Sequence, residues 1–349
     1  MKEKGKLLGA WALVAAMGMP ISANAALQTL SSLFVFGDSL SDGGNSGLIT
    51  GGAYPPPPYY NNQYSNGPVA VEYLWQSYNG NVPFAPSLAG GTNYAVGGAT
   101  SGVLGLAPPP TPEFGNAWQL QQFKQTAPTF DPATSLFVIW LFPNDVFRAD
   151  ANGVLPGTAW GVPGGPLPEA GGLTNPANAS ALIANGVQNI SYAVSELANA
   201  GAQHFLVPNM PDLGKTPDRL GTPDEAGLSV LSQTFNFYLA QAMSQLDATL
   251  TSAEIVQFDT FATFASVQQD PGAYGIRNTT QQCILNPSAC AADNYQWLFW
   301  DGVHPTTYAH EILGAEFRAA VPEPESIFLV AIGLLGIVVT GRQRRKQRT

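Results

Sequence analysis

Four short runs of apolar and β-branched residues alternate with longer amphipathic stretches along this 349-residue chain. Each run is bounded by Gly, Pro, Asn or Asp, as strands usually are, and the four occupy residues 33–36, 135–141, 204–208 and 255–258. Patterns with helical spacing lie between and after them, at residues 69–78, 177–200, 227–250 and 306–319. Because alternating strands and helices favour a parallel sheet covered on both faces, the sequence predicts one elaborated α/β domain.

The two ends of the chain differ from this domain. Lysines near the first residue precede an apolar stretch at 7–21, and Ala23-Asn24-Ala25 then offers a small-x-small cleavage site. This order is typical of a secretory signal peptide, here residues 1–25. At the other end, Val321-Pro322-Glu323-Pro324 leads into an apolar run at 327–340 and a basic tail. That run is shorter than the roughly 20 residues that comfortably span a bilayer.

Two interpretations of the C-terminal segment are open. On its pattern alone, the run at 327–340 is a weak or transient membrane anchor whose basic tail stays cytoplasmic. The order of Pro-Glu-Pro, apolar run and arginine cluster over residues 321–349 also resembles a PEP-CTERM sorting signal. That resemblance implies a bacterial protein exported through the inner membrane to the periplasm, cell surface or medium. It also implies an exosortase-type processing enzyme as a partner.

The chain without its two ends is strongly acidic. Residues 26–321 keep 6 of the 14 basic and 21 of the 24 acidic residues, which leaves a net charge of −15. Such a surface repels polyphosphates and anionic membranes. Nucleic-acid binding is therefore disfavoured, and neutral substrates are expected.

Cys283 and Cys290 lie close together in the part expected to be exported. An oxidising compartment favours a local disulfide between them. Two thiols without nearby histidines do not complete a zinc shell, so no metal site is expected.

Three segments rich in Gly and Pro interrupt the pattern, at residues 50–67, 102–116 and 150–176. Each follows a candidate strand or a candidate catalytic segment. Ligands of open α/β sheets bind outside the carboxyl ends of the strands, so we expect all three segments to surround the active site. The alternative is that they are inert surface insertions.

Ser39 follows the first strand in the sequence Gly37-Asp38-Ser39-Leu40-Ser41. A strand that ends in a turn would present the hydroxyl at the sheet edge, where it can act as a nucleophile in acyl transfer. The alternative is a serine that caps a helix, which is common for Gly-Asp-Ser taken alone.

His304 is the candidate general base, and Asp301 lies three residues before it. An acid at this position can orient the imidazole and stabilise the imidazolium, as in other triads. His204 lies in an apolar strand and is expected in the core. His310 lies in an amphipathic helix and is expected on the surface.

An oxyanion requires hydrogen-bond donors that are fixed in advance. Asn144 follows the second strand, and Gly97-Gly98 offers backbone N–H groups with no side chain in the way. The alternatives are an Asx-turn for Asn144 and a plain tight turn for the glycines. Asp145 is expected to have a structural hydrogen-bonding role.

Taken in order, these segments resemble the GDSL family of SGNH hydrolases over residues 30–319. The resemblance rests on Gly-Asp-Ser-Leu-Ser, Asn-Tyr-Ala-Val-Gly-Gly-Ala, a strand ending in Asn-Asp, and Asp-Gly-Val-His-Pro. It implies a flavodoxin-like three-layer α/β/α sandwich with a central parallel sheet over residues 26–320, and no cofactor or metal. By position it implies Ser39, Asp301 and His304 as the triad. It implies the Ser39 N–H, Gly98 and Asn144 as oxyanion donors, with Gly97 one register away.

One residue departs from the family pattern. Phe142 stands two residues before Asn144, where the family commonly has Gly. A residue with a Cβ does not take a positive φ cheaply. Either the loop carrying Asn144 is displaced, or Phe142 narrows the pocket.

The function expected is that of an exported serine hydrolase of the esterase/lipase type, which cleaves carboxylic esters through an acyl-enzyme. Its substrate would be an acyl ester, a lipid or an acetylated glycan. A polysaccharide O-deacetylase and a phospholipase or lecithinase-like lipase are alternatives within this class. A non-catalytic surface protein that binds exopolysaccharide is the alternative outside it.

Overall fold

The computed structural model describes residues 27, 29–105, 113–159 and 164–321. The expected signal peptide, residues 1–25, lies outside the described residues. So does the C-terminal segment from residue 322 onward.

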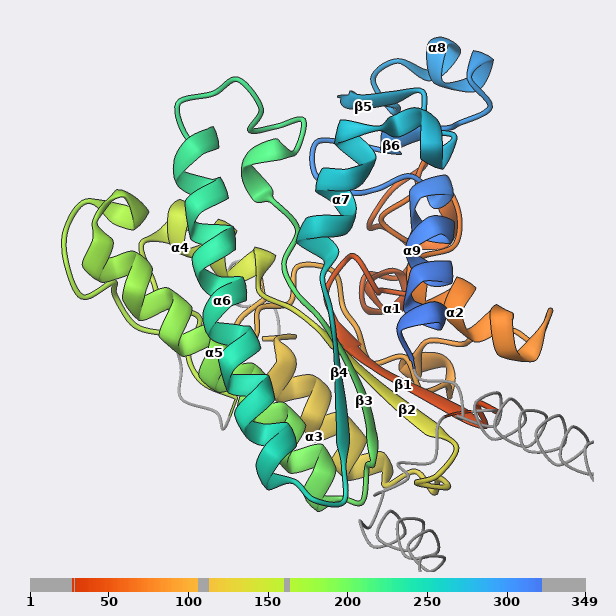
Figure 1. Ribbon diagram of the computed structural model, residues 1–349, viewed down its shortest axis with the longest axis vertical. Helices are drawn as coiled ribbons and strands as arrows, with labels where there is room; N and C mark the ends of the chain where they lie inside the picture. The colour runs from red at the N-terminus through yellow and green to blue at the C-terminus, as the bar shows by residue number, and fades with distance from the viewer. Residues whose placement is uncertain (1–26, 28, 106–112, 160–163, 322–349) are drawn as a thin grey trace, which may run out of the picture.

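The main sheet has four parallel strands in the order β1-β2-β3-β4 (Figure 1). They match the four expected runs to within one residue at each end, and their bounds are β1 Ser32–Gly37, β2 Ser135–Trp140, β3 His204–Pro208 and β4 Glu254–Phe258. The last two strands of the order pair from His204↔Glu254 to Pro208↔Phe258. The expected parallel sheet is therefore confirmed.

A short extended segment, residues 92–96, lies along the free edge of β1. The Val35 N–H donates to Thr92 O at 3.2 Å, and the Tyr94 N–H donates to Val35 O at 2.8 Å. The Val96 N–H donates to Gly37 O at 3.2 Å. Counted as a strand, this segment gives the order 2-1-3-4-5 of flavodoxin-like sheets.

Helices cover both faces of the sheet. One face packs on α3 (Asn116–Thr126), α5 (Pro176–Asn199) and α6 (Glu225–Thr249). The other packs on α2 (Ala70–Asn79), α7 (Thr260–Gln269) and α9 (Thr307–Ala320). Figure 1 shows the two sets on opposite sides of the sheet. The three-layer α/β/α fold class is confirmed. None of the described helices is both long and apolar enough to cross a bilayer.

The expectation that His310 lies on the surface is wrong. Its side chain is fully buried where α9 packs on α2, and its Nδ1 accepts the Ala70 N–H at 3.2 Å. Burial lowers the pKa of His310 to about 3, with the nearby His304 adding to the effect. His204 is buried in β3, as expected.

Asp145 lies in the first turn of α4 (Pro143–Asn152) and is fully buried. Its carboxylate accepts the Ser101 N–H at 2.7 Å and the Ser101 hydroxyl at 2.5 Å. Burial nevertheless raises the pKa of Asp145 to about 7. These contacts join the start of α4 to the segment after Gly98, which agrees with a structural role for this carboxylate.

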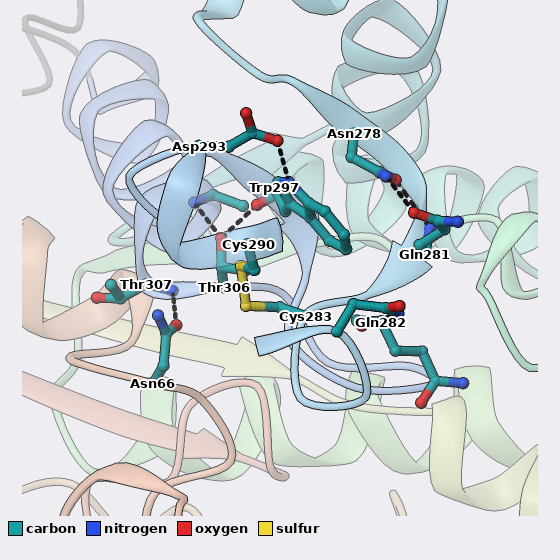
Figure 2. Close-up of a disulfide and its surroundings, with 12 residues drawn as sticks. Asn66, Asn278, Gln281, Gln282, Cys283, Cys290, Asp293, Trp297, Thr306 and Thr307 are labelled. Atoms are coloured by element: carbon teal, nitrogen blue, oxygen red, sulfur yellow. Dashed lines mark hydrogen bonds between the residues drawn. A yellow bond between two sulfur atoms is a disulfide. The ribbon is translucent and has the colours of Figure 1, made fainter. Parts of the chain in front are cut away.

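The disulfide Cys283–Cys290 is present and closes a small subdomain of two short parallel strands and one helix. Its elements are β5 Asn278–Gln282, α8 Pro287–Ala292 and β6 Trp297–Phe299. Figure 2 shows the two sulfur atoms beside Trp297, whose indole N–H donates to Asp293 Oδ2 at 2.8 Å. The Ile284 N–H donates to Trp300 O at 2.8 Å, so the closed loop is bonded to the residue before Asp301.

Removing the disulfide should destabilise the protein. For the double variant Cys283→Ser/Cys290→Ser we expect a loss of about 2–3 kcal/mol in the free energy of unfolding, because a short closed loop no longer restricts the unfolded chain. Urea unfolding of the oxidised parent and the variant measures this loss. Reductant should lower the stability of the parent and leave the variant unchanged. Equal stability of all samples would contradict the prediction.

The contribution of two buried carboxyl groups to stability should fall as the pH rises from 4 to 8. Asp145 and the equally buried Asp38 have folded-state pKa values of about 7, against 3.8 in the unfolded chain. The folded state therefore binds more protons than the unfolded chain in this range. The stability that these two carboxyl groups contribute falls as the pH rises and is lost once the pH passes about 7. Asp145→Asn should flatten the fall, measured by urea unfolding at pH 5 and pH 8. Asp150→Asn, which removes an exposed carboxylate from the same helix, is the control. An unchanged slope in Asp145→Asn would refute this assignment.

Candidate active site

Ser39 lies in a tight turn directly after β1. The turn begins at Gly37, whose N–H and C=O both bond the Gln119 side chain of α3, at 2.9 and 2.8 Å. It closes with the Ser41 N–H donating to Asp38 O at 3.1 Å and the Leu40 N–H donating to Asp38 Oδ1 at 3.0 Å. Both ends of the turn are thus fixed, and the Ser39 side chain lines a cavity.

Ser39 does not cap a helix. The next helix, α1 (Asn45–Ile49), begins six residues later, and the carboxylate at its start belongs to Asp42. Asp42 accepts the N–H groups of Gly44 and Asn45, and its Oδ2 accepts the Ser46 hydroxyl at 2.5 Å. The capping alternative for Ser39 is therefore excluded.

Ser39, His304 and Asp301 form a continuous chain of contacts. His304 Nε2 lies 2.7 Å from Ser39 Oγ, and His304 Nδ1 lies 2.7 Å from Asp301 Oδ2. Burial alone would raise the pKa of Asp301, but the His304 ring and hydrogen bonds from Val303 and His304 hold it at about 2. Asp301 is therefore ionised at neutral pH.

The loop that carries Asp301 and His304 is tied at both ends. The Trp300 N–H donates to His304 O at 2.7 Å and closes the loop on itself. The Ser65 hydroxyl donates to Pro305 O at 2.9 Å. The Thr307 N–H donates to Asn66 Oδ1 at 2.8 Å, as Figure 2 shows. These bonds join the loop to the N-terminal half of the chain, which carries Ser39.

Asn144 and Gly98 line the same cavity as Ser39. The Asn144 amide donates to Ala99 O at 3.1 Å, and the Asn144 side chain also interacts with the buried Asp38 carboxyl. The Gly97 N–H already donates to Asp42 Oδ2 at 2.8 Å. Neither the Gly98 N–H nor the Ser39 N–H bonds another described residue. Of the two glycines, Gly98 is thus the one with a free donor, and its φ of +79° favours glycine.

Phe142 does not line the cavity. It adopts the costly positive φ, +116°, and its ring is fully buried. The ring stacks on Phe235 with centroids 3.6 Å apart and covers Gly186, where an added Cβ would come within 2.2 Å of it. The expectation that Phe142 narrows the pocket is therefore wrong. The packing of the ring between Phe235 and Gly186 compensates the backbone cost, and Asn144 lines the cavity.

The cavity beside Ser39 has a volume of about 440 Å³ and a mostly apolar lining. Two of the three irregular segments contribute to it: residues 50–67 through Tyr54 and Tyr64, and residues 102–116 through Phe114. The expectation for residues 150–176 is wrong for its described part. None of its described residues lines the cavity. The segment instead bonds residues 102–104, where Pro156 O accepts the Val103 N–H at 3.2 Å.

Sequence reasoning missed two residues of the site. Asp42 has no role in the expectations above, yet it also bonds Gly97 and so links the Ser39 turn to the glycine turn. Tyr59 was expected only as part of a loop near the site, yet its hydroxyl donates to Asp301 Oδ2 at 2.7 Å. A contact across 242 residues of chain leaves no local pattern that could have indicated it.

Comparison with known proteins gives relatives of several kinds. The chain is 29% identical over 334 residues to an uncharacterised protein of Pseudomonas putida, and the match covers 84% of this chain and 50% of that one. It is 30% identical over 202 residues to Lipase 1 of Photorhabdus luminescens, covering 58% of this chain and 25% of that one. The chain thus spans half or less of the length of these relatives.

Among solved structures, a catalytic mutant of an acetylxylan esterase from Geobacillus stearothermophilus matches with a TM-score of 0.43 and 14% identity. The match covers 85% of this chain and 97% of that one.

Two family models also match. The PEP-CTERM protein-sorting motif matches residues 320–345, which confirms the resemblance of the C-terminal segment. The GDSL-like lipase/acylhydrolase model matches residues 33–317, which include the four strands and all the site residues described above. This protein therefore belongs to the GDSL-like lipase/acylhydrolase family.

Proposed function

We propose that this chain is an exported serine hydrolase that cleaves carboxylic esters through an acyl-enzyme. The observation that carries the proposal is the chain of short contacts from Ser39 through His304 to Asp301, which opens into an apolar cavity. A protein that only binds polysaccharide has no need of a nucleophile in contact with a base and its orienting acid.

In the first step His304 Nε2 takes the Ser39 proton while Oγ attacks the ester carbonyl. Asp301 accepts the hydrogen bond from His304 Nδ1–H and stabilises the imidazolium that forms. The Ser39 N–H, the Gly98 N–H and the Asn144 amide would hold the oxyanion. His304 then gives its proton to the leaving alcohol. Water attacks the acyl-enzyme with the same assistance and releases the acid.

The cavity lining favours an acyl chain longer than acetyl. Its apolar wall beyond the polar residues includes Ile49, Phe114, Trp140, Phe147, Leu213 and Phe264. Burying methylene groups against such a wall releases water and gains about 0.8 kcal/mol for each group. An acetyl group would leave most of the cavity unused, so fatty-acyl esters are the preferred substrates over acetylated glycans.

Export is supported by the PEP-CTERM motif at residues 320–345. We propose that residues 1–25 are removed as a signal peptide and that residues 26–320 form the mature hydrolase. An exosortase-type enzyme would process residues 321–349, with residues 327–340 as a transient anchor. The disulfide Cys283–Cys290 fits an oxidising compartment outside the cytoplasm.

Ser39→Ala should abolish turnover, whereas Asn144→Ala should lower kcat by about a hundredfold or more and leave measurable activity. The reason is that one oxyanion donor of three is lost, while the nucleophile and base remain. Hydrolysis of p-nitrophenyl butyrate measures both, and fluorophosphonate labelling should be lost only in Ser39→Ala. Asn152→Ala, an exposed asparagine of the same helix, is the matched control. Full activity in Ser39→Ala would refute the mechanism.

Activity should rise with acyl-chain length from acetate to hexanoate. We expect kcat/KM to increase by up to about fourfold for each added methylene that enters the cavity. A series of p-nitrophenyl esters measures the increase, with acetylated xylan as the competing substrate class. If acetate esters were cleaved fastest and lengthening lowered kcat/KM, the acyl proposal would give way to an O-deacetylase.

A further inference from the structure

The Tyr59 hydroxyl contacts the carboxylate that orients the candidate base. It donates to Asp301 Oδ2 at 2.7 Å, the same oxygen that lies 2.7 Å from His304 Nδ1. The other carboxylate oxygen, Oδ1, accepts the N–H groups of Val303 at 2.9 Å and of His304 at 2.7 Å. Four donors share this carboxylate, and the phenol is the one that comes from a distant segment.

The phenol acts on Asp301 as a neutral donor. Burial and the negative charge of Asp301 raise the pKa of Tyr59, so its proton stays in place at neutral pH. A hydrogen bond from a neutral donor to a carboxylate is charge-assisted and stronger than one between neutral groups. The bond therefore affects the charge that Asp301 presents to His304.

The Tyr59 ring is held in place from several sides. It meets Trp300 edge-on, with centroids 6.1 Å apart, and Tyr64 with centroids 6.3 Å apart. It also packs on the buried cluster that contains the disulfide Cys283–Cys290. Four prolines precede it, and each restricts the backbone because its ring fixes φ. The hydroxyl is thus directed at Asp301 by packing and by chain stiffness together.

We propose that Tyr59 is a positioning residue that extends the activity of the Ser39 site to lower pH. The inference rests on the proposed function. The hydrogen bond from the phenol reduces the negative charge at Oδ2, so Asp301 stabilises the imidazolium form of His304 less. His304 can then act as a base at lower pH. By fixing the carboxylate, it also keeps His304 Nε2 directed at Ser39.

Other titratable groups face this pair from neighbouring elements. Asp38 at the end of β1 and His310 in α9 interact with His304, while Tyr54 and Tyr64 interact with Tyr59. Asp212 and Lys215 lie farther along the cavity wall. Replacing Tyr59 by Phe keeps the ring against Trp300 and leaves all these groups in place, so the change isolates one proton donor.

The first test is the pH profile of kcat/KM for Tyr59→Phe on p-nitrophenyl butyrate. We expect the acid limb to move to higher pH by about half a unit or more, because hydrogen bonds to a charged form shift titrations by this order. At pH 6, kcat should fall several-fold with little change in KM. Tyr60→Phe, which removes the hydroxyl of the exposed neighbouring tyrosine, should leave the profile unchanged.

The second test needs no substrate. The chain has three histidines, so NMR of protein labelled at histidine can follow each imidazole, with the His304 signal assigned by its loss in His304→Gln. The midpoint of that titration should rise in Tyr59→Phe and stay constant in Tyr60→Phe. Identical His304 titration curves in the parent protein and Tyr59→Phe would overturn the proposal. A loss of activity in Tyr59→Phe by the same factor at every pH would overturn it as well. A parent protein without esterase activity would defeat the proposed function, while the NMR titration would still decide the role of Tyr59.

Discussion

The parallel register of β1 and β2 determines where chemistry can take place in this protein. Gly37 pairs with Trp140 at the end of the ladder, so both strands leave the sheet at the same level. The turn after β1 carries Ser39, and the turn after β2 leads into α4 and Asn144. All six residues of β2 are buried, which opposes any slip of this register. The candidate nucleophile and a candidate oxyanion donor are neighbours for this reason.

The candidate base, His304, comes from another part of the chain. His304 follows the small β5–β6 sheet, and its loop is fastened to the Ser65–Asn66 segment rather than to the main sheet. The site is thus a junction between the parallel sheet and the disulfide subdomain. Its geometry depends on how the two are joined, since either part alone carries an incomplete set of groups.

Local patterns predicted the local parts of this structure well. The four strands and the helices α2, α5, α6 and α9 lie within two residues of their expected ends, because apolar periodicity reports burial directly. The polar strand Asn278–Gln282 has no such periodicity and was not expected. The prediction for His310 was wrong because the amphipathic pattern of α9 indicates only the face that packs on the sheet. The packing of α2 on α9 buries His310 as well, and the sequence of α9 alone does not indicate that contact.

The residue types of the site could be predicted, but their supporting contacts could not. Ser39, His304 and Asn144 stand at recognisable places relative to strands. The bond from Tyr59 to Asp301 depends on the path of a proline-rich loop and on a disulfide far along the chain. Such contacts join residues that are distant in sequence, and nothing near either residue specifies them.

The contact of Phe142 with Gly186 limits which substitutions this chain can accept at these two positions. Phe142→Gly alone would relieve the backbone but empty a slot of phenylalanine size, at a cost of about 3–5 kcal/mol. A larger residue at position 186 alone would collide with the ring, since even a Cβ lies 2.2 Å from it. Only coordinated changes at both positions keep the core filled. Each of the two residues therefore restricts what the other position can hold.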